Sequence, residues 1–545
     1  MAQRLLALLA LAASLALAAA AAAPDPTDDP TLLRMGPGAK RISKRIVERP
    51  LNLEQFRENK EADGAFTAPP TPFEHAAGYF ALNRTSAANM FYFYFKSRGD
   101  PSTDPVVLWM TGGPGCSSEL AVFYENGPYS INADLSLAVT PHGWDTVSNL
   151  IYVDQPINTG FSYSTDPADD VHDEKRVAED MLQFLSEFVQ AHPELDGNDF
   201  YITGESYAGH YVPAVSYRVF RAQQEGAGPG MKLKGFAIGN GLTMPEIQYG
   251  AYGDYARGMD VVDKAAADAA AAVYPACAAK VRKCGGGAGK EGPAAESKKR
   301  AAACLDAVDF CEAIPGGLLQ AAGDINVYDV RKHCVGSLCY DFSNAETFLN
   351  QPAVRAALGV GDRKWEMCSG KVHSDMMADW MRNLEPVVPP MLEAGLRVMI
   401  YAGEDDFICN WLGNRRWVRA MEWSGQAAFN ATLPVPFVVD GVTGGDVIES
   451  GLLSFVKMSE SGHMVPMDQP KNAVTMLQRF ITGVPIAGAP WETSTDTPKT
   501  SSSSSSAAKL TLVRPAAAES VEGGDAAAAA AAKKEPRRAM GSAAA

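Results

Sequence analysis

The sequence predicts an α/β protein built on a mostly parallel, doubly wound β-sheet with an inserted cap. Five continuous apolar runs end in glycine or a small polar residue, as buried parallel strands do because both of their faces are covered. Helical patterns, such as VAEDMLQFLSEFVQAH at 177–192, lie between these runs. An interval from 245 to 365, rich in Ala, Gly and Lys, interrupts the alternation. We therefore predict a core in two parts, 66–244 and 366–490, with a cap at 245–365 between them.

The five predicted strands follow one another along the core. They are VVLWMTGG (106–113), NLIYVDQP (149–156), DFYITGES (199–206), LKGFAIGNG (233–241) and RVMIYAGE (397–404). In a doubly wound sheet the loops at the carboxyl ends of the strands form the functional site. The small and polar residues that end these runs are therefore candidates for that site.

The two ends of the chain differ in composition from the core. Residues 1–23 carry one arginine and then a leucine/alanine run, which is typical of a secretory signal peptide; a membrane anchor is the alternative. Residues 24–65 are poor in aromatic residues and suggest a pro-segment or, equally simply, a solvated arm. Residues 491–545 contain SSSSSS and alanine runs, and we predict a disordered tail because such a composition buries little apolar surface.

The net charge and the composition of the chain exclude some classes of binding partner. The formal net charge of −16 argues against nucleic-acid binding and predicts little attraction to anionic membranes. No segment after the first 23 residues approaches the roughly 20 apolar residues that span a bilayer. A secreted chain enters an oxidising compartment, in which cysteines pair. We expect a protein of the secretory pathway, delivered to a vacuole or lysosome-like compartment or to the exterior, with an oligomeric state that the sequence leaves open.

The stretch YITGESYAG (201–209) has the pattern of a nucleophile elbow. An apolar run leads into a turn of small residues and then a helix start, an arrangement that exposes a serine, here Ser206, at the top of a sheet. Triads in this context follow the chain order serine, acid, histidine. His463 is the histidine near the end of the core, in GHMVP. The acid is one of three neighbours, Glu404, Asp405 and Asp406, and their spacing does not choose among them.

Four ordered motifs resemble those of the serine carboxypeptidases, among them the plant and yeast vacuolar enzymes. They are LWMTGGPGCSS (108–118), TGESYAGHYVP (203–213), AGEDDFICNWLG (402–413) and SGHMVPMDQP (461–470). The resemblance spans roughly 72–485. It implies an α/β-hydrolase fold and removal of C-terminal residues from peptides and proteins that have a free C-terminus.

The resemblance assigns roles by position. It implies Ser206 as nucleophile, His463 as base and Asp406 as the acid, because the family's aspartate lies three residues before a cysteine, here Cys409. The oxyanion hole would be the N–H groups of Gly113 and Tyr207.

Further positions are expected to bind the substrate. The family holds the substrate carboxylate with acids that keep a proton, here Glu205 and Glu125, together with Gly112 and Thr111, where relatives usually have asparagine. A glutamate that only caps a helix is the alternative for Glu205. Side-chain pocket residues would be Tyr340, Cys409 and Met464, and core packing is the alternative for the last two.

Nine cysteines leave at least one unpaired. Two pairs with a spacing of seven would each lie on one face of a helix, and two antiparallel helices would bond them as Cys277–Cys311 and Cys284–Cys304. The resemblance supports this nesting and adds Cys334–Cys339 and Cys116–Cys368, which leaves Cys409 free. The loop 285–300 between the nested pairs is either a cleavage site or a plain flexible loop.

Other features complete the expectations. Asn83 and Asn430 begin N-x-[ST] sequons and are candidate glycosylation sites. We expect no metal and no cofactor, since the cysteines serve as disulfides and no zinc-protease motif occurs.

An acyltransferase on the same scaffold and a catalytically idle secreted binding protein are the rival functions. Glu205 and Ala208 favour the peptidase over the acyltransferase, and the presence of nucleophile, base and acid together argues against an idle protein.

Overall fold

A twelve-stranded sheet organises the chain in the computed structural model, which describes residues 40–57, 74–85, 87–285, 294–336 and 338–488. In sheet order its strands are β1 (Lys40–Arg41), β2 (Ile46–Leu51), β3 (His75–Ala81), β4 (Asn89–Phe95), β8 (Asn149–Val153), β5 (Val106–Met110), β9 (Asp199–Glu205), β10 (Lys232–Gly239), β11 (Arg397–Gly403), β14 (Leu453–Met458), β13 (Val442–Ser450) and β12 (Val435–Val439). A separate hairpin pairs β6 (Tyr129–Ile131) with β7 (Leu137–Val139).

The middle of the sheet is parallel and its edges are antiparallel. Strands β8, β5, β9, β10, β11 and β14 pair in parallel. The five predicted strands all lie in this central part, so the predicted α/β class is confirmed. On one edge β1–β4 pair antiparallel, and on the other β13 and β12 do. The alternation of β4 sends Tyr92 to one face of the sheet and Phe91 and Phe93 to the other.

The helices complete the architecture. They are α3 (Glu119–Tyr124), α4 (Glu174–Ala191), α5 (Ala208–Gln224), α6 (Pro245–Gln248), α7 (Tyr252–Gly258), α8 (Lys264–Cys284), α9 (Ala294–Cys311), α10 (Ala313–Ala322), α11 (Ser343–Leu349), α12 (Pro352–Leu358), α13 (Gly370–Met376), α14 (Val388–Glu393), α15 (Trp411–Ala420), α16 (Gln426–Ala431), α17 (Val465–Asp468) and α18 (Pro470–Thr482). Helices α4 and α5 pack on one face with Phe184 and Val215, and α18 packs on the other with Leu477. Helices therefore cover both faces, as in doubly wound folds.

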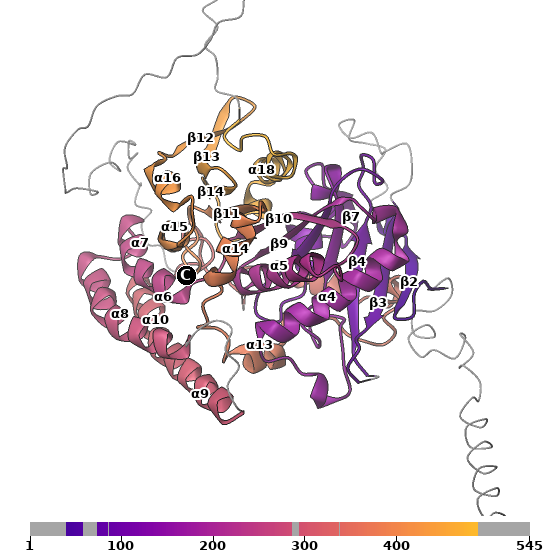
Figure 1. The fold of residues 1–545 in the computed structure, drawn as a ribbon, viewed down its shortest axis with the longest axis horizontal. Helices are drawn as coiled ribbons and strands as arrows, with labels where there is room; N and C mark the ends of the chain where they lie inside the picture. The colour runs from indigo at the N-terminus through magenta and orange to yellow at the C-terminus, as the bar shows by residue number, and fades with distance from the viewer. Residues whose placement is uncertain (1–39, 58–73, 86, 286–293, 337, 489–545) are drawn as a thin grey trace, which may run out of the picture. The chain divides into compact units, whose positions relative to one another are not determined.

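The predicted cap interval is divided between the two faces of the sheet. Helices α8, α9 and α10 lie together at the lower left of Figure 1, away from β2–β4 on the right, and they contribute Cys277 and Leu318 to the core beside α4 and α5. Helices α11 and α12 contribute Phe348 and Leu358 to the core on the opposite face. The limits of the cap at 245 and 365 stay a prediction.

Disulfides tie distant parts of the chain. The structure contains Cys277–Cys311, Cys284–Cys304, Cys334–Cys339 and Cys116–Cys368, the pairs that we expected. Cys409 is buried and is a free thiol. Two of the disulfides join α8 to α9, and Cys116–Cys368 ties the loop after β5 to the segment before α13.

The remaining predictions on the ends of the chain are mostly outside the described residues. The signal peptide at 1–23, the tail at 491–545 and residues 286–293 of the predicted loop 285–300 fall there, whereas residues 294–300 of that predicted loop are the start of helix α9. Strand β2 lies inside the interval predicted as a pro-segment, and Ile46 and Val47 are buried in the sheet core. The limits of a pro-segment therefore stay a prediction, but this part of it is an integral strand of the fold. Among the described helices, none combines the length and the apolar character needed to cross a bilayer.

Candidate active site

Ser206 occupies a tight turn between a central strand and a helix. Strand β9 ends at Glu205 and helix α5 begins at Ala208. Ser206 has a φ of 68°, in the left-handed region that is unfavourable for a residue with a side chain. A Cβ added to Gly204 would lie 2.4 Å from the carbonyl oxygen of Met110, so the approach of β5 requires glycine there. Ser206 is partly exposed, as expected for a nucleophile elbow.

Of the three adjacent carboxylates, only Asp406 contacts His463. The Nδ1 atom of His463 lies 2.8 Å from Oδ2 of Asp406. Glu404 instead accepts a hydrogen bond from Lys457 at 2.7 Å, and Asp405 forms an ion pair with Arg331 at 3.2 Å. The geometry thus resolves the choice that the spacing of the three residues had left open.

Asp406 is fully buried behind His463 and has several donors. Its carboxylate accepts hydrogen bonds from the Asn240 side chain at 2.8 Å and from the backbone N–H groups of Ile408 and Cys409 at 3.0 and 3.3 Å. These bonds fix the carboxylate and keep it an acceptor for the imidazole N–H. Asn240 was not among the predicted site residues, although it directly follows a predicted strand in GNG.

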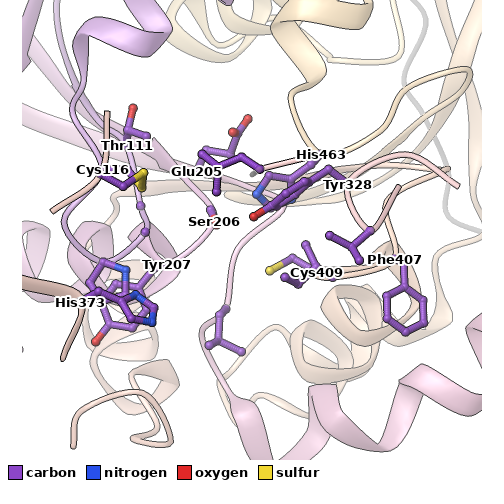
Figure 2. A pocket seen from close by; sticks show the side chains of 18 of the residues that line it. Thr111, Cys116, Glu205, Ser206, Tyr207, Tyr328, His373, Phe407, Cys409 and His463 are labelled. Carbon is purple, nitrogen blue, oxygen red and sulfur yellow. A yellow bond between two sulfur atoms is a disulfide. The ribbon is translucent and has the colours of Figure 1, made fainter. Parts of the chain in front are cut away.

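A cavity of about 480 Å³ brings the predicted residues together. Its lining includes Thr111, Gly112, Gly113, Glu205, Ser206, Tyr207, Tyr340, Cys409, His463 and Met464. Figure 2 shows Ser206 near the middle of the view, with Thr111 and Glu205 above it and Tyr207 and His373 below. Asp406 and Glu125 do not line the cavity, and both are buried.

The loop after β5 and the start of α5 leave two backbone donors beside Ser206. Within the described part of the chain, the N–H groups of Gly113 and Tyr207 have no hydrogen-bond acceptor. A Cβ added to Gly112 would lie 2.4 Å from the nitrogen of Tyr207 and 2.9 Å from Cβ of Ser206. Glycine at 112 therefore allows the loop to approach the elbow closely.

Glu205 and Glu125 form a buried pair of carboxyl groups. They are 3% and 5% exposed, and among the described residues no donor reaches Oε2 of Glu205 or either carboxyl oxygen of Glu125. Burial, together with the neighbouring Glu125, raises the pKa of Glu205 well above its usual range. Burial also raises the pKa of Glu125 to about 7. At acid pH the pair is therefore protonated, and a protonated carboxyl is a hydrogen-bond donor.

Thr111 lies at the same end of the cavity and keeps its own donor. Its hydroxyl oxygen accepts a hydrogen bond from the indole N–H of Trp109 at 3.0 Å. The hydroxyl proton remains available to an acceptor in the cavity, because the Trp109 bond uses only a lone pair of the oxygen. A threonine here supplies one donor where the amide of an asparagine would supply two.

The predicted side-chain pocket is divided. Tyr340 and Met464 pack with Leu120 and Phe342 in one small apolar cluster. Cys409 lies in the main core instead, although it also lines the cavity, and burial raises the pKa of its thiol. The structure therefore groups two of the three predicted pocket residues and separates the third.

Several cavity residues had no signal in the sequence. Trp380, His373 and Tyr328 line the cavity, and the ring of Tyr328 lies 5.0 Å from that of His463. Their segments contain no motif, so only spatial proximity identifies them. Asn83 and Asn430 are exposed, and their glycosylation stays a prediction. In the described ranges no group of three His, Cys, Asp or Glu residues is arranged to hold a metal ion.

Comparisons with known proteins identify the family of the chain. A family profile described as serine carboxypeptidase matches residues 65–483. The chain is 53% identical over 409 residues to serine carboxypeptidase 3 of Oryza sativa subsp. japonica, covering 75% of this chain and 79% of that protein. It is 50% identical over 439 residues to serine carboxypeptidase-like 48 of Arabidopsis thaliana, covering 81% and 84%.

A solved structure has the same fold. The crystal structure of Kex1(delta)p, a prohormone-processing carboxypeptidase from Saccharomyces cerevisiae, matches with a TM-score of 0.67 at 21% identity, covering 80% of this chain and 95% of that one. This likeness supports the α/β-hydrolase fold. With the family profile covering most of the chain and relatives at about half identity, this chain belongs to the serine carboxypeptidase family.

Proposed function

We propose that the chain hydrolyses peptides at their free C-terminus, releasing one amino acid at a time at acid pH. The observation that carries the proposal is the buried pair of Glu205 and Glu125 beside Ser206, three of whose four carboxyl oxygens lack a donor in the described chain. A buried carboxyl pair without partners is costly unless it holds protons. A protonated pair beside a nucleophile is suited to bind the carboxylate at the end of a peptide.

Substrate binding begins at this pair. At acid pH a protonated carboxyl of the pair donates a hydrogen bond to the substrate carboxylate, assisted by the Thr111 hydroxyl and the Gly112 backbone. As the pH rises, the proton is lost, the donor becomes a negative charge, and the carboxylate of the substrate is repelled. Binding of peptides therefore weakens with rising pH, and a blocked or amidated C-terminus lacks the group that is recognised.

Acylation uses Ser206, His463 and Asp406. The Ser206 oxygen attacks the carbonyl carbon of the last peptide bond while His463 accepts the hydroxyl proton at Nε2. Asp406 accepts the Nδ1–H bond, which orients the ring and stabilises its charged form. The N–H groups of Gly113 and Tyr207 stabilise the negative oxygen of the tetrahedral intermediate. The C–N bond then breaks, and the departing amine takes the proton from His463.

Deacylation repeats these steps with water. His463 accepts a proton from water, the resulting nucleophile attacks the acyl-enzyme, and the Ser206 oxygen recovers its proton as the ester bond breaks. The shortened peptide leaves with a new C-terminus, which the same carboxyl pair can bind. A single site would therefore release amino acids from a peptide one after another.

The side chain of the released residue is expected to be apolar. The apolar cluster of Leu120, Phe342 and Met464 with Tyr340 lines the cavity, and we propose that this side chain packs against it. The disulfides and the leucine/alanine run at the N-terminus support residence in the secretory pathway, in a vacuole-like compartment or outside the cell.

A pair of matched peptides tests the proposal. Purified protein is incubated at acid pH with an unblocked peptide and with its C-terminally amidated twin, with and without a serine-directed phosphonylating inhibitor. We expect stepwise trimming of the free-acid peptide only, abolished by the inhibitor and by Ser206→Ala. Internal cleavage, equal trimming of both peptides, or transfer of an acyl group without hydrolysis would contradict it.

A further inference from the structure

The wall of the cavity on the Tyr207 side of Ser206 contains a chain of aromatic contacts. The indole of Trp380 stacks on the ring of Tyr207, with centroids 5.4 Å apart and planes at 28°. Its N–H donates to the hydroxyl of Tyr249, from the short 3₁₀ helix Tyr249–Ala251, at 3.0 Å. The Tyr249 hydroxyl in turn donates to Oε1 of Glu312. This relay connects the residue after the nucleophile to an acidic side chain on the cap.

Glu312 places a carboxylate in an otherwise largely apolar part of the cavity. It precedes helix α10 and lines the cavity with Tyr252, Leu319 and Phe407. Glu312 is an exposed residue. Because the Tyr249 hydroxyl bonds only to Oε1, Oε2 is free to accept a further hydrogen bond. In the described ranges no lysine or arginine forms an ion pair with it. The carboxylate is held in position but has no cation.

The two ends of the cavity receive different parts of a peptide, if the proposed function holds. The carboxyl pair with Glu205 binds the C-terminal carboxylate, so the residue that is released lies at that end. Ser206 attacks the next carbonyl group. The penultimate residue then lies beyond Ser206, on the side of Tyr207 and of Trp380, which stacks on Tyr207. Figure 2 shows Tyr207 on the opposite side of Ser206 from Glu205.

We propose that Glu312 binds the side chain of the penultimate residue and favours substrates with arginine or lysine at that position. The aromatic wall from Tyr249 and Tyr252 packs against the aliphatic part of such a side chain, and Oε2 of Glu312 accepts a bond from its charged end. This inference rests on the proposed function and adds a substrate class to it.

The preference depends on pH in a defined direction. The titratable groups that face Glu312 are the hydroxyls of Tyr249 and Tyr252, from the 3₁₀ helix and α7, and both tyrosines are neutral because burial raises their pKa. Partial burial of the Glu312 carboxyl group raises its pKa as well, and the hydrogen bond from Tyr249 lowers it. Glu312 is therefore partly neutral in acid and gains its charge as the pH rises. The preference for a cationic penultimate residue therefore increases as the pH rises.

Arginine and citrulline provide a matched pair of substrates, since they have nearly the same shape and differ in charge. We measure kcat/KM for N-blocked Arg-Leu and citrulline-Leu dipeptides, each with a free C-terminus, at about pH 5 and about pH 7. Effects of pH on Ser206, His463 and the carboxyl pair are common to both substrates and cancel in the ratio. We expect a ratio of roughly tenfold in favour of arginine, larger at the higher pH.

Two variants sharpen the test. Glu312→Gln is expected to reduce the ratio toward one and to remove its rise with pH. Asp309→Asn, in helix α9 three residues before Glu312 but exposed and outside the cavity lining, is expected to keep the wild-type ratio. A wild-type ratio near one at both pH values, or an unchanged ratio in Glu312→Gln, would overturn the inference while hydrolysis itself upheld the proposed function. Failure to hydrolyse either dipeptide would refute both.

Discussion

Two buried pairs of carboxyl groups flank one short helix, and they differ in how their oxygens are used. Helix α3 begins at Glu119, which faces Asp154 at the end of β8, and ends just before Glu125, which faces Glu205. Burial raises the pKa of all four groups. Both pairs therefore hold protons in the folded protein, yet only one of them lies beside the nucleophile.

The Glu119–Asp154 pair is provided with donors. Oε2 of Glu119 accepts from the Ser117 hydroxyl and from the indole N–H of Trp365, the latter at 3.3 Å. Asp154 accepts from the backbone N–H groups of Ser118 at 3.2 Å and Phe161 at 2.7 Å. A buried polar group that is fully hydrogen-bonded stabilises its surroundings. This pair fixes the loop that carries Gly112 and Gly113.

The Glu205–Glu125 pair lacks such donors. Three of its four oxygens are buried and accept no bond from a donor among the described residues. Such a group costs free energy in the fold unless a ligand uses it. The difference teaches that burial and a raised pKa alone do not identify a functional carboxyl pair. In this comparison the pair beside Ser206 lacks the surrounding donors that the Glu119–Asp154 pair has.

The largest effect is expected from removing the structural pair. Glu119→Ala leaves Asp154 buried and takes an acceptor from Ser117 and Trp365, so it should lower the free energy of unfolding by about 3–5 kcal/mol. Glu119→Gln is the matched control, because its oxygen can accept those bonds while its amide donates to Asp154, as a protonated Glu119 would. Chemical denaturation at acid pH measures both variants. Equal stability of Glu119→Ala and the wild type would refute the assignment of this pair as structural.

The same pair gives a pH dependence of stability with a defined sign. Carboxyl groups whose folded-state pKa is raised bind more protons in the folded than in the unfolded state, so stability falls as the pH rises from the unfolded pKa toward the folded one. Since burial raises the pKa of Glu119 and of Asp154, the wild type should lose stability as the pH rises above the ordinary carboxyl range of about 4. Glu119→Gln removes one of these protons, and its decline in stability with rising pH should be shallower than that of the wild type. Parallel pH profiles for the two proteins would contradict this.

The substrate-facing pair should respond in the opposite way, with a small change in stability and a larger one in binding. Glu205→Gln is expected to raise KM for a free-acid peptide by roughly tenfold and to flatten the rise of KM with pH, because an amide cannot lose the proton. Unfolding should change by less than about 1 kcal/mol, since Oε2 of Glu205 has no donor to lose. Steady-state kinetics with a peptide and a blocked ester separate the two effects, and the ester should be affected less. A dependence of KM on pH that keeps its wild-type shape would refute the binding of the substrate carboxylate by this carboxyl pair.

Apolar patterns in the sequence predicted most of the central sheet and Ser206 for a physical reason, whereas the resemblance to the serine carboxypeptidases supplied the residues around Ser206. Strands buried on both faces need continuous apolar runs, and the carboxyl ends of parallel strands gather at one edge, so local patterns carried long-range information. Strands β2–β4 were not predicted. They pair antiparallel at an edge of the sheet, and no comparable pattern was recognised in their segments.

The partners of side chains were harder to predict than the backbone. Glu404, Asp405 and Asp406 are adjacent in the sequence, but Lys457, Arg331 and His463 select among them from other elements. In the same way, the sequence did not show that Glu119 and Asp154 form a second buried carboxyl pair. The donors to this second pair come from distant segments, such as that of Trp365.

The smallest effect is expected at Thr111, which lines the cavity beside Glu205. If its hydroxyl donates to the substrate carboxylate beside the Glu205 pair, Thr111→Ala should raise KM for free-acid peptides about threefold to tenfold, through the loss of one hydrogen bond. Thr111→Asn is the informative partner, because an amide can accept from Trp109 and still donate. Its KM should equal or fall below that of the wild type, and its rise with pH should persist since the carboxyl pair is intact. If both variants bind peptides as the wild type does, the carboxylate is held by Glu205, Glu125 and the Gly112 backbone without help from residue 111.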